Sequence, residues 1–395
     1  MSIKIIKINI SSKELEERKL RCEMQRNFKK PDRVPVVPIL DAWYWLPKIG
    51  KTYREYFSSA KEMLECQLLA QKWYLENIKS DLYEIMIHPV IAYVSEAGTF
   101  GAEIEFREDN VPWVKKHPIK NEGDLEKLEK IDPIYSGLHG RELKLREEML
   151  KIAGNYKIKF NDNVEIGIKD KIGIDYNIFS YAQGIIGILG VAGRTLGPMI
   201  IANDLRGATD MYMDVLSNPE FAKRLLDIIT IKIITWIEFT KELMGESREG
   251  VFVGDDGAGN LSPSVYREIL FPYHKRIKEY FGGYTIFHTC GKVEHLFEII
   301  ANELKINDFS GIGYQNDREL IAKFFSGRII LSGNIDPNNI DKGNKESIIV
   351  ECRDAIEHFA PYGGYFLKGG DDPPPTASIE NINYMYEAAI KYGKY

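Results

Sequence analysis

The chain holds few cysteines, and they are not grouped. Its 395 residues include four, Cys22, Cys66, Cys290 and Cys352, with no CxxC pair among them. A disulfide-stabilised secreted scaffold is therefore excluded, and we expect a reducing, cytoplasmic location. The N-terminus also lacks the apolar segment that a signal peptide requires, so none is expected.

Long apolar runs and excess positive charge are missing as well. The most apolar stretch, 184–202, is interrupted by Arg194, Pro198 and several glycines, which favours a buried barrel wall over a membrane span. The net charge of −6 argues against nucleic acid or an anionic membrane as the partner. A hydrophobic content of 44% is typical of a globular protein. The length suits either one large barrel or two ordinary domains.

The order of the predicted elements indicates an α/β fold. Helical patterns cover 12–28, 58–78, 138–154 and 218–245, strand-like runs cover 32–46 and 81–94, and 103–119 is typical of a hairpin. Later in the chain, five short runs alternate with helical stretches: 250–259, 284–291, 306–313, 328–337 and 364–375. Such alternation predicts parallel strands. We expect one domain over 1–395, with a helical extension at 1–30 and a less regular insertion at 100–180.

Polar residues gather where the predicted strands end. In a (β/α)₈ barrel these ends form the active-site face, although an open doubly wound sheet also binds ligands there. A dinucleotide-binding GxGxxG motif would favour the open sheet, and none follows a strand. The residues at these ends are Asp41, His88, Asp255, Asp256, His288, Cys290, Asn334, Asp336, Asp371 and Asp372.

The segment FHTCG, 287–291, offers two metal-binding side chains at one strand end. Residues two apart on a strand face the same side, so His288 and Cys290 should point to the barrel axis. Imidazole and thiolate are ligands that Zn²⁺ favours. Two ligands do not make a site, and a buried histidine and cysteine in the core are the alternative interpretation.

Several segments resemble the uroporphyrinogen decarboxylase-like superfamily. They are HTCG at 288–291, SGNIDP at 332–337, the C-terminal GGDDP and ENI, and the longer match over 193–227. The resemblance covers the chain from about 184 to its end and, more loosely, 12–100. It implies a (β/α)₈ barrel. The superfamily includes decarboxylases and cobamide-dependent methyltransferases.

The resemblance favours the methyltransferase branch. The decarboxylases carry an arginine-rich segment that holds propionate carboxylates, whereas LDAWYWLPKIG at 40–50 contains no arginine. HTCG resembles the zinc motif of the methyltransferases. Those that methylate coenzyme M have a third ligand, a cysteine near the C-terminus, where this chain reads LKGGDDPPP. Asp371 is the natural replacement, so the resemblance implies a zinc site of His288, Cys290 and Asp371.

A carboxylate ligand makes zinc harder and more Lewis-acidic, which suits polarisation of an ether oxygen. We therefore expect transfer of a methyl group from a methoxylated or methylated small molecule to a corrinoid. The DxHxxG pattern of corrinoid-binding proteins is absent from the sequence, so the corrinoid is expected on a partner protein. Displacement at carbon by Co(I) would follow, with zinc stabilising the leaving oxygen.

Other strand-end residues have both a functional and a structural interpretation. Asp255 or Asp256 could add a metal ligand or bind a substrate hydroxyl, or could cap helices, and alternation puts the two on opposite faces. His88 could donate to a substrate oxygen or cap its own strand. The predicted substrate-binding set, with core packing or loop ordering as the alternative, is Asp41, Trp43, Tyr44, Trp45 and Asn334. Three histidines, His274, His295 and His358, are expected on the surface.

Three other functions remain open from the sequence. They are a metal-free decarboxylase or lyase that uses Asp255, Asp256 and His88, a methylcobamide:thiol methyltransferase, and a non-catalytic barrel that binds a ligand. The sequence reveals neither the methyl donor, nor the direction of transfer, nor the fourth metal ligand. It allows a homodimer without predicting one.

Overall fold

The core of the protein is a parallel sheet of six strands in the order β11-β10-β9-β8-β7-β6. The computed structural model describes residues 3–89, 91–174 and 193–395. The strands are β6 (Arg194–Thr195), β7 (Val251–Gly254), β8 (Thr285–His288), β9 (Asp308–Ile312), β10 (Ile330–Ile335) and β11 (Tyr365–Gly369). Sequence neighbours are sheet neighbours throughout, as helix-linked parallel strands require. The five strands predicted after residue 250 are confirmed.

Two extended segments continue the sheet beyond β11. Val36 forms a parallel bridge with Leu367, and the amide of Asp81 donates to the carbonyl of Val36 at 2.7 Å. The strands predicted at 32–46 and 81–94 are therefore confirmed only in their first parts, which are extended with few ladder bonds, whereas Ala42–Lys48 and Ala92–Val94 are helical. Between the residues that are described, no bridge joins β6 to the 81–87 segment. The α/β fold with parallel strands is established, and closure into a (β/α)₈ barrel stays a prediction.

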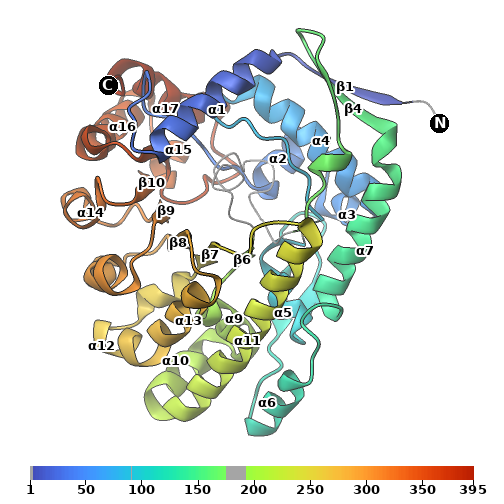
Figure 1. Ribbon diagram of the computed structural model, residues 1–395, viewed down its shortest axis with the longest axis vertical. Coiled ribbons are helices and arrows are strands. Elements are labelled where there is room, and N and C mark those ends of the chain that lie inside the picture. The colour runs from blue at the N-terminus through green and yellow to red at the C-terminus, as the bar shows by residue number, and fades with distance from the viewer. Residues whose placement is uncertain (1–2, 90, 175–192) are drawn as a thin grey trace.

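Helices surround the six-stranded sheet, whose strands β6 to β10 lie in the interior in Figure 1. In the first half they are α1 (Ser12–Arg26), α2 (Ala42–Lys48), α3 (Tyr53–Tyr56), α4 (Ala60–Asn77), α5 (Ser95–Thr99), α6 (Glu122–Glu129) and α7 (Gly137–Ile152). The second half contributes α9 (Pro198–Arg206), α10 (Ala208–Ser217), α11 (Pro219–Met244), α12 (Pro263–Val265), α13 (Phe271–Phe281), α14 (Arg318–Phe325), α15 (Pro337–Lys342), α16 (Lys345–Phe359) and α17 (Ile379–Tyr392). The long helices expected near 12–28, 58–78, 138–154 and 218–245 are confirmed. None of the described helices has the length and apolar character needed to cross a bilayer.

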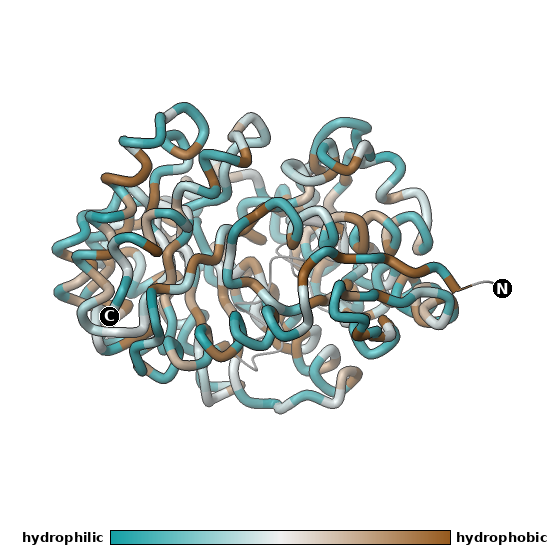
Figure 2. The backbone as a smooth tube through the Cα atoms, turned by 90° about the horizontal axis from the view of Figure 1, so that it is seen from above, coloured by the Kyte–Doolittle hydropathy of each residue, from teal (hydrophilic) through white to brown (hydrophobic). Residues whose placement is uncertain are grey.

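The sequence predicted a helical extension at 1–30, but this N-terminal region also contains a strand. Strand β1 (Lys4–Ile8) pairs in parallel with β4 (Tyr156–Phe160), which pairs with β5 (Glu165–Gly167). The predicted hairpin is confirmed as β2 (Glu103–Glu105) and β3 (Trp113–Lys116). Figures 1 and 2 place the two chain ends on opposite sides of the molecule. Part of the apolar stretch 184–202 and the end of the insertion lie outside the described residues.

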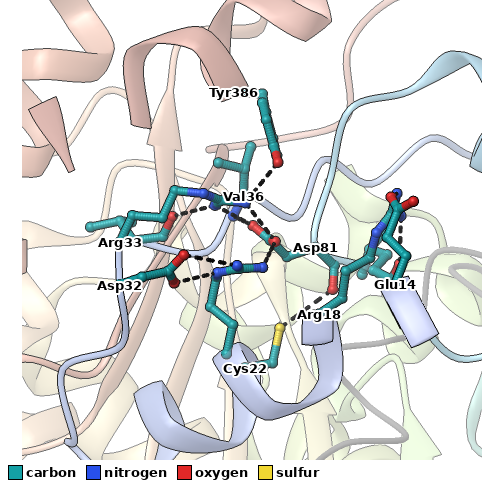
Figure 3. Close-up of polar contacts among 11 residues, drawn as sticks. Glu14, Arg18, Cys22, Asp32, Arg33, Val36, Asp81 and Tyr386 are labelled. Atoms are coloured by element: carbon teal, nitrogen blue, oxygen red, sulfur yellow. Dashed lines mark hydrogen bonds and ion pairs between the residues drawn. The ribbon is translucent and has the colours of Figure 1, made fainter. Parts of the chain in front are cut away.

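A buried ion-pair cluster fastens α1 to the start of the sheet (Figure 3). The carboxylate of Asp81 accepts hydrogen bonds from Arg33 at 2.6 and 2.8 Å and from Arg21 at 2.8 Å. It also accepts from the amide of Val36 at 2.7 Å. The side chains of Asp81 and Arg33 are 1% and 4% exposed, so both charges depend on each other for compensation. The cluster therefore fixes the two extended segments beside β11.

Removing the charge of Asp81 should destabilise the fold strongly. We expect Asp81→Asn to lower the free energy of unfolding by roughly 3–5 kcal/mol, because Arg33 is left buried without a carboxylate. Asp32→Asn is the matched control, since Asp32 also pairs with Arg21 but its side chain is 63% exposed. That variant should lose less than about 1 kcal/mol. Denaturant unfolding measures both, and equal losses would contradict the prediction.

Candidate metal centre

His288 and Cys290 face one cavity, as the strand alternation predicts. His288 is the last residue of β8, and Cys290 follows two positions later. Both side chains line a cavity of about 430 Å³ at the carboxyl ends of the strands. Phe287, which directly precedes His288, is instead buried. The ring of His288 stacks on that of Phe252, with 6.2 Å between the ring centres and 24° between the ring planes.

Asp256 completes a group of three metal-ligating side chains. One ligand atom each from Asp256, His288 and Cys290 lies within 4.8 Å of the other two. The Oδ1 atom of Asp256 is 3.7 Å from Nε2 of His288 and accepts a hydrogen bond from the amide of Cys290 at 2.7 Å. An imidazole nitrogen, a sulfur and a carboxylate oxygen converge on one point, which is the donor set of a zinc site.

The tautomer of His288 suits metal binding. Its Nδ1 lies 2.7 Å from the carbonyl oxygen of Ser310. Because a carbonyl only accepts, Nδ1 carries the proton, and Nε2 presents its lone pair toward Asp256. Burial lowers the pKa of His288, although the Asp256 carboxylate opposes this effect. The imidazole is therefore neutral, as a metal ligand must be.

The environment of Cys290 favours a bound cation. Burial raises the pKa of its thiol, and the carboxylates of Asp256 and Asp371 raise it further. A thiol among carboxylates loses its proton only when a cation compensates the added negative charge. The residues present therefore fit a zinc ion.

Zinc binding should release one proton near neutral pH, and that proton comes from Cys290. The pKa of the Cys290 thiol is raised, so the thiol is protonated there, whereas the pKa of His288 is lowered, so the imidazole is already neutral. The apparent zinc affinity should then fall about tenfold for each pH unit between roughly pH 8 and pH 6. Calorimetry in two buffers of different ionisation enthalpy counts the protons, and release of none would contradict the assignment of Cys290.

Asp371, the third ligand expected from the sequence, lines the same cavity but stands farther away. Among the described residues, an oxygen of Asp371 forms no group of three metal-ligating atoms that all lie within 4.8 Å of one another. Its side chain is exposed, and one of its oxygens accepts from the amide of Asp372 at 2.8 Å. The structure therefore brings Asp256, rather than Asp371, next to His288 and Cys290.

Asp255 stabilises the structure around the site, and its side chain does not line the cavity. Its carboxylate accepts from the amides of Met199 and Ile200, at 3.0 and 3.1 Å, and so caps the N-terminus of α9. It also pairs with Nε2 of His274 at 2.8 Å. The structural interpretation of Asp255 is thus the observed one. The prediction that His274 lies on the surface was wrong, because it is 1% exposed between Asp255 and Tyr266.

Two more predicted site residues lie away from the cavity. Within the described residues neither ring nitrogen of His88 has a hydrogen-bond partner, and burial lowers the pKa of His88 to about 4. Asn334 is buried and accepts from Arg318 at 2.9 Å, which connects β10 to the start of α14. Neither side chain lines the cavity.

The aromatic cluster at 43–45 divides between cavity and core. Trp43 lines the cavity and stacks on Tyr93, with 5.7 Å between ring centres. Tyr44 donates to the carbonyl of Ala377 at 2.8 Å, and Trp45 is buried at 1% exposure. Asp41 caps α2 and accepts from Tyr93 at 2.7 Å. Burial raises the pKa of Asp41 to about 6.

The sequence did not single out four other cavity residues. They are Tyr93, Trp113, Arg194 and Asp204. The guanidinium of Arg194 lies 4.3 Å above the ring of Phe252, and Trp113 comes from the β2–β3 hairpin. Arg194 is the second residue of the segment 193–227 that resembles the superfamily, which is the one signal that could have pointed to it. The cavity is therefore lined both by aromatic rings and by metal-ligating and acidic groups.

Comparison with known proteins agrees with this architecture. The M. mazei protein described as "methyltransferase from Methanosarcina mazei" superposes with a TM-score of 0.68 at 18% identity, over 95% of this chain and 98% of that one. Uroporphyrinogen decarboxylase of Schizosaccharomyces pombe is 24% identical over 44% of this chain and 50% of its own length. That of Prochlorococcus marinus is 22% identical over 92% of this chain and 95% of its length. For the first of these two decarboxylases, the chain spans about half the relative's length.

The protein has a parallel α/β fold, and ionisable side chains line a cavity at the carboxyl ends of its strands. Enzymes with such folds place their active sites at these ends. The model of the family described as uroporphyrinogen decarboxylase (URO-D) matches residues 178–392. Because this match covers more than half of the chain, the protein belongs to the URO-D family.

Proposed function

We propose that this protein is a zinc-dependent methyltransferase that moves a methyl group between a small methylated compound and the corrinoid of a partner protein. The observation that carries the proposal is the convergence of Asp256, His288 and Cys290 within 4.8 Å. These three side chains open into a cavity of about 430 Å³, a size suited to a small molecule. The protein also has the same overall fold as a methyltransferase, which supports the proposal.

His288, Cys290 and Asp256 would hold the zinc ion in this proposal. When bound, zinc would act as a Lewis acid toward an oxygen of the substrate. Ser310 keeps His288 in the tautomer that presents Nε2, and the Cys290 amide keeps Asp256 oriented. Trp43 on Tyr93 supplies an apolar wall that places the methyl group and excludes water from it.

The partner would approach the open side of the cavity. We further propose that the strands close into a (β/α)₈ barrel, so that all these side chains surround one mouth. A methoxylated compound remains the proposed substrate, since a carboxylate-containing zinc site suits an oxygen leaving group. The protein partner would bring its corrinoid to the methyl carbon at that mouth.

Decarboxylation of uroporphyrinogen, the activity that names the family, is not favoured by the cavity. Four acidic side chains line it, and Arg194 is the one arginine or lysine among the described lining residues. A substrate with many carboxylates would therefore find a single cationic partner in this cavity. The acidic residues are Asp204, Asp256, Asp371 and Asp372.

Metal analysis followed by a transfer assay tests the proposal. Protein purified without added metal should contain about one zinc per chain, and His288→Ala should lose it while remaining folded. The zinc-loaded protein should then methylate added cob(I)alamin stoichiometrically from a methoxyarene. Zinc-free wild-type protein would support the metal-free decarboxylase or lyase. Bound zinc without transfer from any methyl donor would support a non-catalytic binding protein.

A further inference from the structure

Asp204 is fixed in position relative to the metal-ligating group. It lies on α9 four residues after Ile200, so both side chains share one helix face, and both line the cavity. The amide of Ile200 is bound by Asp255, which directly precedes Asp256. Four residues correspond to a rise of about 6 Å along a helix. The helix cap therefore holds Asp204 about one turn from the strand end that carries Asp256.

The carboxyl of Asp204 is not committed to another group. Among the described residues it makes no hydrogen bond or ion pair, and only its backbone carbonyl is used, by Nδ1 of His117 at 2.7 Å. Burial raises the pKa of Asp204 to about 7. A carboxylic acid that keeps its proton near neutral pH and lines a cavity is suited to general-acid catalysis.

The other acids of the cavity are less suited to that role. Asp256 belongs to the metal-ligating group, and Asp371 is exposed and already accepts from the amide of Asp372. Asp372 is the nearest rival, since burial raises its pKa as well. The carboxylates of Asp41 and Asp371 raise that pKa further, and Lys368 and Arg194 oppose them more weakly, so several charged neighbours act on Asp372. For Asp204, burial is the only cause of its shift.

We propose that Asp204 is the general acid of the methyl transfer and protonates the leaving oxygen of the substrate. This inference rests on the proposed function. The O–CH₃ bond breaks with its electron pair remaining on oxygen, and the methyl carbon bonds to the partner's cobalt, which passes from Co(I) to Co(III). The Asp204 proton moves to the oxygen, and solvent then returns a proton to the carboxylate. The product is the alcohol or phenol.

A leaving-group comparison tests this role. The probes are anisole and 4-nitroanisole, with added cob(I)alamin as acceptor and the zinc-loaded Asp204→Asn variant as enzyme. Loss of a general acid should slow transfer from anisole by about 100-fold or more. Transfer from 4-nitroanisole should hardly change, because nitrophenolate leaves without a proton. Asp210→Asn, on the exposed face of the neighbouring α10, is the control and should slow neither.

The outcomes separate this inference from the function on which it rests. If wild-type protein methylates cob(I)alamin from neither ether, the proposed transfer from methoxylated compounds fails and the acid role fails with it. If the wild type is active and Asp204→Asn slows both ethers equally, only the acid role of Asp204 is overturned. A selective loss with anisole in Asp372→Asn, and not in Asp204→Asn, would likewise overturn it. Zinc content and thermal unfolding of each variant show that metal site and fold are intact.

Discussion

Replacing Asp256 with alanine should lower the zinc affinity by on the order of 100-fold or more, whereas replacing Asp371 with alanine should leave zinc bound. The reason is geometric. An oxygen of Asp256 lies within 4.8 Å of the ligand atoms of His288 and Cys290, and no such group includes Asp371 within the part of the chain that is described. Both residues line the same cavity. Comparing the two variants therefore distinguishes a residue that binds the metal from one that only lies in the cavity.

The measurement is zinc content after dialysis against a graded chelator, followed by methyl transfer to cob(I)alamin. Asp256→Asn serves as a second variant, because an amide oxygen can still accept from the Cys290 amide that the Asp256 carboxylate now engages. It should keep the fold and still lose affinity for zinc, since the charge is gone. Zinc loss in Asp371→Ala with zinc retained in Asp256→Ala would restore the ligand set that the sequence predicted.

The His288–Cys290 pair was predicted from the period of two of a strand, and both side chains do line the cavity although β8 ends at His288. The same rule gave no answer at two other strand ends. At Asp255 the backbone turns (φ −140°, ψ 80°) and enters the short helix at Asp256–Asn260. Alternation correctly separates the two aspartates, yet it cannot tell which one faces the cavity. Strand β11 ends at Gly369, so the position of Asp371 in the following loop was not fixed by any periodic pattern.

Long-range partners explain the other differences between sequence and structure. His274 was expected on the surface because it lies on a helix rich in charged residues. The burial of His274 depends on its hydrogen bond with Asp255, which is 19 residues away in the chain. The buried carboxyl of Asp255 beneath α9 in turn needs such a partner. Strand β1 was missed for a similar reason, since its ladder partner β4 lies about 150 residues later. The parallel sheet itself was predictable because strand–helix alternation is a local signal.

Replacing Gly311 with alanine should disable the metal centre without touching a ligand. A Cβ atom at this position would lie 2.6 Å from both Cε1 and Nδ1 of His288. The contact would push the ring away from Ser310, whose carbonyl now holds Nδ1 at 2.7 Å. We expect zinc affinity to fall by about 10- to 100-fold, the usual effect of losing the group that orients a metal-binding histidine.

The backbone contributes a second effect that a control must remove. Gly311 has φ +68°, so any side chain adds strain of order 1–3 kcal/mol. Gly50 has nearly the same φ of +69°, but nothing lies within 4 Å of its added Cβ. Gly50→Ala should therefore lose a similar amount of stability and retain zinc. If both variants hold zinc equally well, the position of His288 does not depend on Gly311, and Ser310 is not the group that orients the imidazole.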